Sequence, residues 1–480
     1  MRSLKAGGSK ARITPALGTR LQGHITRSGP ATAVLDELYC RVLALEGGKT
    51  RALIACCDLL ELHQDFVDEL KSELERRFSL PPDRCLLCAT HTHTGPPTID
   101  LGGLKADGVY LNRLKGWIVT AAEEALGSLE AVRLRFAAFP FTSIGVNRRL
   151  PTAGGVRMAP NPSGPLDPEA AVLAFEREDG TPVAALVHHA VHPTTLGVSL
   201  HAVSADYPGQ ACRFLEDRLG GELTVLFAQG ACGDVRPSVT NGKGSFREGS
   251  EEDIIQLGRR LGAAFLKGWN SGTSLEAHSL RGRMRQIELP LGPLPTRAEL
   301  EDERERRLRL AEQAEREATG GEERGPTHTG RRENRSPGEE DSWEQQHMDQ
   351  RVLHLAVAAW AQEMIGKARA VGLPRCVRGN IQALAFGRQL VLIGFPGELF
   401  SEIGMRIKER SPFPRTLLCG YAGGTVGYVP TRSAFSEGGY EVSDAYKLYG
   451  LPSAFRRDVE EIVYGEMSSL LADLYDESAG

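Results

Sequence analysis

Five short polar clusters in this chain of 480 residues carry the side chains that could do chemistry together. Between them they offer two imidazoles, a carboxylate and a phenol, a mixture of nitrogen and oxygen ligands that suits Zn²⁺. The most economical use of such a site is hydrolysis. Only the fold can bring these clusters together, because they lie at residues 90–96, 147–149, 192–195, 233–237, and 396–398 with 427–431.

The first cluster contains His91 and His93, directly after the apolar run 85–89. Two residues apart on a strand, both side chains point to one face, and at a strand exit they can flank one site. One imidazole can then ligate a metal while the other faces the substrate as a base. The alternative is a polar turn with two solvated histidines. The Gly-Pro that follows and the other clusters favour the functional interpretation.

A second apolar run ends in His188, His189 and His192. His192 precedes a proline, which disfavours helix and places this residue at a strand exit. We therefore predict His192 as a metal ligand. We expect His188 or His189 to be a core histidine whose hydrogen bonds are satisfied.

The last clusters supply an acid and two phenols. Glu398 follows an apolar run and a Pro-Gly pair, which can turn the chain and aim the carboxylate back over the strand end. Glu398 also lies at the N-terminus of a predicted helix over 399–408, where a negative charge stabilises the helix dipole. This structural role is compatible with a role in the site. Tyr428 and Tyr440 lie in a glycine-rich loop. Each is either a buried anchor or part of the site, and the residues alone leave both interpretations open.

The elements that must position these side chains alternate along the first 230 residues. Strand-like runs lead into polar, glycine-rich loops and then into helical patterns, which is typical of α/β domains with their chemistry at strand ends. We predict an α/β layered sandwich of mixed β-sheet with flanking helices. The predicted strands are 38–45, 52–57, 85–89, 132–139, 171–175, 183–187, 223–227, 381–386 and 390–395, and the predicted helices are 64–78, 109–126, 208–219, 348–368 and 456–474.

The stretch 296–341 differs in composition, because Glu and Arg dominate it. Opposite charges three and four apart over 299–317 predict a solvent-exposed helix, whereas 320–341 has the composition of a mobile segment. We predict one catalytic domain made of 1–295 and 342–480, interrupted by a charged surface insertion at 296–341. The alternatives are a lid over the site or a dimer contact.

The overall composition argues against several classes of protein. With 41% hydrophobic and 25% charged residues the chain is typical of a globular protein, and a net charge of −5 argues against a nucleic-acid partner. No apolar run is long enough for a membrane span, and the first residues do not resemble a secretory signal. Nine cysteines, an odd number, argue against a disulfide framework. We expect a cytoplasmic protein.

Cys85 and Cys88 have the spacing of half a zinc knuckle. No second cysteine pair follows at a suitable distance, and two leucines separate them. We interpret both thiols as part of a core strand.

Taken together, the clusters resemble the neutral/alkaline ceramidase family. That family has Thr-His-Thr-His, Asn-Arg, His-Pro-Thr, Gly-Asp-Val, Pro-Gly-Glu and tyrosine-rich segments, and here they occur in the same order. Residues 11–15 and 57–60 are also similar to the family's first strands. Each motif alone is weak, but six in the right order indicate homology over residues 10–455.

The resemblance implies a role for each cluster. It implies His93 as a proton acceptor near the metal, with Arg148 and Tyr440 as donors to an oxyanion. Tyr440 follows Tyr428 by the family's spacing. The implied zinc ligands are His91, His192, Glu398 and Tyr428.

Two departures from the family affect the expected substrate. The serine of its Gly-Asp-Val-Ser-Pro segment is Arg236 here, and a guanidinium cannot replace a hydroxyl nucleophile. Family members also carry a C-terminal immunoglobulin-like domain and are secreted or face a membrane, features that this sequence does not display. We therefore expect a polar or anionic small molecule as substrate rather than long-chain ceramide.

The sequence thus predicts a zinc-dependent hydrolase that cleaves an amide or ester bond with a metal-activated water. The alternative is a catalytically silent homologue that binds a metal or ligand on the same scaffold. The intact ligand set favours the enzyme, and Arg236 favours the silent homologue. The oligomeric state has no signature in the sequence.

Overall fold

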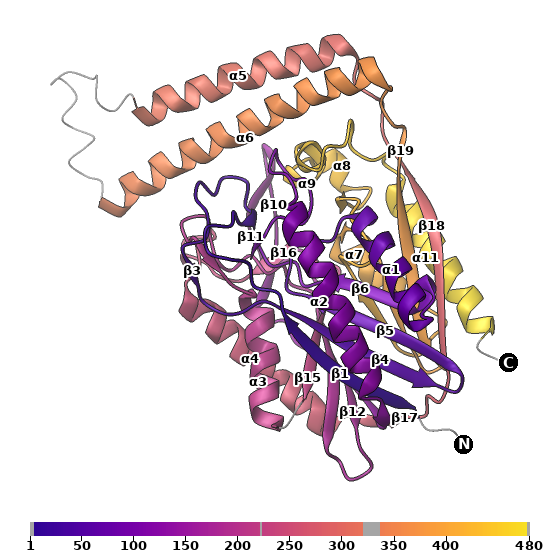
Figure 1. The fold of residues 1–480 in the computed structure, drawn as a ribbon. Coiled ribbons are helices and arrows are strands. Elements are labelled where there is room, and N and C mark those ends of the chain that lie inside the picture. The colour runs from indigo at the N-terminus through magenta and orange to yellow at the C-terminus, as the bar shows by residue number, and fades with distance from the viewer. Residues whose placement is uncertain (1–3, 221–222, 320–336, 478–480) are drawn as a thin grey trace.

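Three β-sheets surround one apolar core at the centre of the fold (Figure 1). The computed structural model describes residues 4–220, 223–319 and 337–477, with the backbone alone for 319 and 337–349. Leu43, Leu186 and Leu384, one from each sheet, are buried in this core. The first sheet has the order β6-β5-β4-β1-β8, with β1 Lys5–Arg12, β4 Tyr39–Gly47, β5 Thr50–Cys57, β6 Cys85–Ala89 and β8 Glu130–Ala131.

The other two sheets complete the centre. The second has the order β15-β13-β12-β9-β17, and the third β18-β19-β20-β22. Their strands are β9 Arg133–Pro140, β12 Glu169–Glu176, β13 Pro182–His189, β15 Thr224–Gln229 and β17 Thr273–Leu275, then β18 Leu280–Pro290, β19 Cys376–Phe386, β20 Leu390–Gly394 and β22 Thr416–Cys419.

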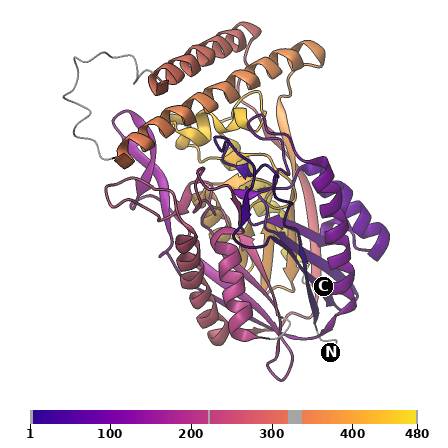
Figure 2. The same ribbon diagram turned by 60° about the vertical axis from the view of Figure 1, so that its left-hand side comes forward.

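Helices cover the outer faces of the sheets. In α1 the residues Phe66, Leu70 and Leu74 recur every four positions and are buried, which explains the amphipathic pattern. Figure 2 shows the α1–α2 pair and the α3–α4 pair on opposite sides of the sheets. The predicted α/β class is confirmed. The covering helices are α1 Gln64–Phe78, α2 Gly108–Gly127, α3 Asp206–Leu219, α4 Glu251–Ser271, α7 Ser401–Arg410 and α11 Val459–Glu477.

The carboxyl ends of three parallel strand pairs meet at one place. β6 runs parallel to β5, β15 to β13 and β22 to β20. The loop after β22 joins the other two edges, since Ala89 donates its N–H to the carbonyl of Tyr421 and Gly420 donates to that of Gln229. Loops that follow these strands are therefore brought close together.

Short elements complete this end of the molecule. β10 lies between β11 and β16, and β21 pairs in parallel with β23. No helix among the described residues is long and apolar enough to span a bilayer. The bounds are β10 Gly145–Thr152, β11 Gly155–Asn161, β16 Val235–Pro237, β21 Glu398–Leu399, β23 Tyr428–Val429, α8 Ala434–Glu437, α9 Tyr440–Ser443 and α10 Ala445–Leu448.

A helical hairpin connects β18 to β19 and lies across the same end (Figure 1). Its helices are α5, Arg297–Thr319, and α6, Pro337–Ala370. Arg307 of α5 donates to Asp444 at 2.6 Å, and Trp360 of α6 donates to the carbonyl of Leu451 at 2.8 Å. The predicted insertion 296–341 covers α5 and the start of α6. The segment predicted as mobile, 320–341, lies mostly outside the described residues.

Candidate metal centre

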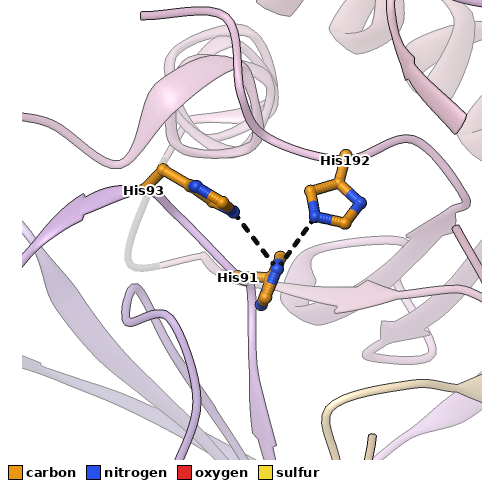
Figure 3. A group of neighbouring side chains, drawn as sticks. All are labelled: His91, His93 and His192. Atoms are coloured by element: carbon orange, nitrogen blue, oxygen red, sulfur yellow. Dashed lines mark hydrogen bonds between the residues drawn. The ribbon is translucent and has the colours of Figure 1, made fainter. Parts of the chain in front are cut away.

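Two imidazoles face each other where β6 and β13 end. His91 Nε2 lies 3.0 Å from His192 Nε2 (Figure 3). The Nδ1–H of His91 donates to the carbonyl of Leu60 at 2.8 Å, and that of His192 donates to the carbonyl of Cys232 at 2.9 Å. These bonds fix both tautomers, so in the neutral rings each Nε2 presents a bare lone pair. His91 has φ 69°, a strained conformation that occurs at functional sites.

Glu398 supplies the third electron-rich atom. Its Oε2 lies 3.3 Å from the Nε2 of His91 and 3.3 Å from that of His192. A tetrahedral Zn²⁺ with bonds of about 2.0–2.1 Å sets neighbouring ligand atoms about 3.3 Å apart. All three side chains are buried. The site therefore fits Zn²⁺ in both donor chemistry and spacing.

Burial and neighbouring groups set the charge of these ligands. Burial, with the positive charge of Arg148, holds the pKa of His192 well below its usual range, so this imidazole is neutral and able to ligate. Burial alone would raise the pKa of Glu398, but a protonated His91 and the hydrogen bonds from His91 and Tyr449 outweigh it and lower the pKa, so in the absence of a metal a proton on His91 can bridge to this carboxylate. The carboxylate is therefore ionised, as a metal ligand must be.

Tyr428 stands directly opposite Glu398 in the parallel β21–β23 pair. Its hydroxyl accepts a hydrogen bond from Nη2 of Arg148 at 3.0 Å, and its ring packs edge-on against Tyr440 with the centroids 6.0 Å apart. The fold thus places Tyr428 beside the carboxylate. Its role as the fourth ligand stays a prediction.

His93 occupies the outer side of the pair. Its Nε2 lies 3.2 Å from His91 Nε2 (Figure 3), and its Nδ1 is buried without a hydrogen-bond partner among the described residues. Burial, then the nearness of His24 and His91, which would repel a positive charge once protonated, holds the pKa of His93 well below its usual range. Its Nδ1 is a nitrogen free to accept a proton, and the ring also belongs with His91 and His192 to a group whose ligand atoms could hold a metal ion. Of the two histidines in the first cluster, His91 is the one in contact with both His192 and Glu398.

A buried ion pair positions Arg148 on β10. Its Nε donates to Glu441 at 2.9 Å, and Arg149 donates to the other oxygen of the same carboxylate at 2.6 Å. Glu441 follows Tyr440 at the start of α9, so this ion pair ties β10 to the loop that carries both tyrosines. The structure therefore gathers the predicted oxyanion donors, Arg148 and Tyr440, around Tyr428.

Three residues of the site had not been predicted. Tyr449 Oη lies 2.6 Å from Glu398 and 2.5 Å from Glu61, while the ring of Tyr421 stacks on His91 at 3.9 Å. Burial, then the charge of Glu398, raises the pKa of Glu61 well above its usual range. A protonated Glu61 can donate to Tyr449, whose single proton then goes to Glu398. Glu61 lies four residues after β5, so like His91 it is a polar residue that shortly follows an apolar strand, and it could have been predicted from the sequence.

Other residues of the predicted clusters lie apart from the ligands. His188 and His189 are buried and bonded to the carbonyls of Leu418, at 2.8 Å, and Glu169, at 3.3 Å. Both are therefore core histidines, but the predicted full satisfaction of their hydrogen bonds is wrong, because Nδ1 of His188 and Nε2 of His189 are buried without a partner among the described residues. Cys85 and Cys88 are buried free thiols in β6.

The fold and the site together define the class of protein: a mixed α/β scaffold with a buried His–His–Glu cluster where the strand ends converge. The model of neutral/alkaline non-lysosomal ceramidases, N-terminal, matches residues 5–253. The chain belongs to this family, which confirms the resemblance seen in the sequence.

Individual proteins of known sequence or structure are also similar to this chain. The neutral ceramidase of Pseudomonas aeruginosa is 26% identical over 403 residues, covering 76% of this chain and 56% of the relative, so the chain spans about half the relative's length. The crystal structure of neutral ceramidase from Pseudomonas aeruginosa superposes with a TM-score of 0.71 at 20% identity, covering 99% of this chain and 75% of that one. A ceramidase complexed with C2 gives 0.69 at 19% identity, covering 99% and 76%. At these identities the structures support the fold.

Proposed function

We propose that this protein is a zinc-dependent hydrolase that cleaves an amide or ester bond in a small N-acyl substrate. The observation that carries the proposal is the convergence of His91, His192 and Glu398, whose ligand atoms lie 3.0–3.3 Å apart. Bound Zn²⁺ supplies a water whose pKa is lowered to about 7 and a Lewis acid for the carbonyl.

The protein's own groups supply the proton transfers and the oxyanion contacts. His93, neutral and beside His91, accepts the proton of the attacking water and returns it to the leaving amine or alkoxide. Arg148, held by Glu441, and Tyr440 donate to the oxygen that becomes negative. Losing one such donor typically lowers the rate about 100- to 1,000-fold. No hydroxyl nucleophile is needed, so Arg236 is compatible with this route.

A cavity of about 300 Å³ next to the centre supports a small substrate. His24 lines this cavity, and its ring lies 4.9 Å from that of His93. The volume is at the lower end of the range for ligand pockets, about 300–1,000 Å³. A short acyl group fits such a space better than the two long chains of a ceramide.

The test is a metal assay combined with hydrolysis of a panel of N-acyl and ester compounds by the zinc-loaded protein. We expect one zinc per chain and turnover that a chelator removes. Zinc bound at full stoichiometry without turnover of any compound would support the second candidate, a silent metal-binding homologue, for which Arg236 argues. Protein that binds no zinc when supplied with it would refute the hydrolase.

A further inference from the structure

Two arginines beside the candidate metal centre have no carboxylate partner. Arg27 is only 4% exposed, and it donates to the carbonyls of His93 at 2.9 Å and Gly197 at 3.0 Å. Arg236, which is partly exposed, donates to the carbonyl of Thr194 at 3.2 Å and stacks on Phe246, with its guanidinium carbon 4.4 Å from the ring centroid. The Nε of each arginine is buried without a hydrogen-bond partner. Within the described part of the chain, no carboxylate oxygen lies within 4.0 Å of either guanidinium.

Both guanidiniums bind the same loop. This loop, residues 194–197, follows the predicted ligand His192, and it accepts from Arg236 at its start and from Arg27 at its end. His24 lies between these contacts, 3.1 Å from the carbonyl of Leu196. Burial, then the charges of Arg27 and Arg236, lowers the pKa of His24 to about 3, so this residue is neutral and both cations act on one small region.

This arrangement is costly without an anion. A charge removed from water needs an opposite charge as well as hydrogen bonds, and carbonyl groups supply only partial charges. Arg148 and Arg149 satisfy this need, since they share the carboxylate of Glu441. Arg27 and Arg236 have no carboxylate within 4.0 Å among the described residues, and the charges of Glu248 and Asp206 act on them only from farther away. Burial is the largest influence on both arginines and lowers the pKa of each to about 10, which leaves them charged at neutral pH.

The cavity of about 300 Å³ reaches this region. Arg27 and His24 form part of its wall, and Arg236 lies outside the wall but close enough for its charge to act on His24. The remaining wall comes from residues 20–23 and 25, from the 101–104 loop, and from Val352, Leu355 and Ala356 of α6, and it is mostly apolar apart from Arg20 and Gln22. A space with an apolar wall and a cationic end suits a molecule with an acyl group and an oxyanion. Guanidinium groups are the preferred partners of carboxylates and phosphates.

We propose that Arg27 and Arg236 form the subsite for an oxyanion of the substrate, and that the substrate is therefore a short-chain N-acyl compound with a carboxylate or phosphate on its amine part. This proposal rests on the proposed amide hydrolysis and names its substrate class. Arg236 replaces the serine of the related motif, so the subsite belongs to this chain in particular.

The experiment compares three probes with the same acyl group: N-hexanoylglycine, N-hexanoyl-phosphoethanolamine and neutral N-hexanoylethanolamine. With zinc-loaded protein, kcat/KM should be about 10- to 100-fold higher for at least one anionic probe than for the neutral one, as expected for hydrogen bonds to charged groups. R236S should reduce this ratio about tenfold or more, and R236K should retain part of it. The matched control is R218S, because Arg218 also stacks on a phenylalanine, 5.2 Å from the ring of Phe214. It should behave as wild type.

Calorimetric binding of the same probes to zinc-loaded and chelator-treated protein separates the two proposals. Binding of an anionic probe that R236S weakens, without hydrolysis, would support the subsite and contradict the hydrolase. Hydrolysis with equal kcat/KM for anionic and neutral probes, or an anion preference that R236S and R27Q leave unchanged, would overturn the subsite. Circular dichroism melting confirms that each variant is folded.

Discussion

His91 and His192 present their Nε2 atoms to each other across 3.0 Å, although 101 residues separate them in the chain. Both Nδ1 atoms are hydrogen-bonded to backbone carbonyls, so in the neutral rings the two Nε2 lone pairs face each other, and a bound metal cation would relieve their repulsion. Glu398 adds a carboxylate oxygen at 3.3 Å from each. This geometry is the central support for a metal centre.

The ligand assignment predicts different results for neighbouring histidines. H91A and H192A should each lose bound zinc, because each removes one of the converging nitrogens. H93A should keep zinc and lose turnover, because His93 touches His91 but not Glu398. Zinc content is measured by mass spectrometry after gel filtration. H278A, at an exposed position, is the control and should match wild type. Full zinc occupancy in H91A or H192A contradicts the assignment.

Tyr449 should tune the metal affinity without binding the metal. Its hydroxyl bridges Glu61 and Glu398, so Y449F leaves the liganding carboxylate beside a second carboxyl group without the shared proton donor. Loss of such a supporting contact typically weakens metal affinity about 10- to 100-fold. Competition with a chelating dye measures the change. Y464F, whose ring packs on exposed Arg406, is the control. Equal affinity in Y449F and wild type would show that the bridge is unimportant.

Glu441 should be a large contributor to stability. E441Q leaves Arg148 and Arg149 buried without their shared carboxylate, and breaking a buried pair in this way costs about 3–5 kcal/mol. The matched control is E437Q: Glu437 also pairs with Arg149, but its side chain is 45% exposed. That change should cost about 0–1 kcal/mol. Urea unfolding measures both, and similar losses in the two variants would contradict the prediction.

His189 should make the protein less stable in acid. Burial lowers its pKa to about 4, whereas the unfolded chain protonates it near pH 6.5. The unfolded state therefore binds the extra proton first, and stability is lost as pH falls from about 6.5 towards 4, by up to about 3 kcal/mol.

Urea unfolding at pH 7 and pH 4.5, in chelator to remove metal effects, checks this prediction. H189Q should lose less stability between the two pH values than wild type does. H278Q, an exposed control, should show the wild-type dependence. An unchanged pH dependence in H189Q would show that His189 is protonated equally in both states.

Local pattern was sufficient for much of the fold. The helix predicted at 64–78 has the same bounds as α1, because its apolar period and its ends are both encoded locally: His63 caps the start and Ser79 adopts a left-handed conformation after the end. β1, by contrast, was not predicted. Its sequence is rich in glycine and lysine, and it forms a strand because β4 and β8 pair with it on either side.

Some residues of the candidate site were likewise predictable from local sequence, and others were not. His91, His192 and Glu398 were predictable because each is a polar residue that follows an apolar strand. Tyr421 follows the apolar strand β22 in the same way, whereas Tyr449 carried no such signal, since it lies after α10 and reaches Glu61 and Glu398 only through the tertiary fold. Contacts of that kind depend on tertiary structure and have no local period.

The most direct test of the central claim is anomalous diffraction from zinc-loaded crystals, recorded on both sides of the zinc absorption edge. The account predicts one anomalous peak about 2.0–2.2 Å from Nε2 of His91, Nε2 of His192 and an oxygen of Glu398. Absence of a peak there, or a zinc peak held only by other residues, would contradict it.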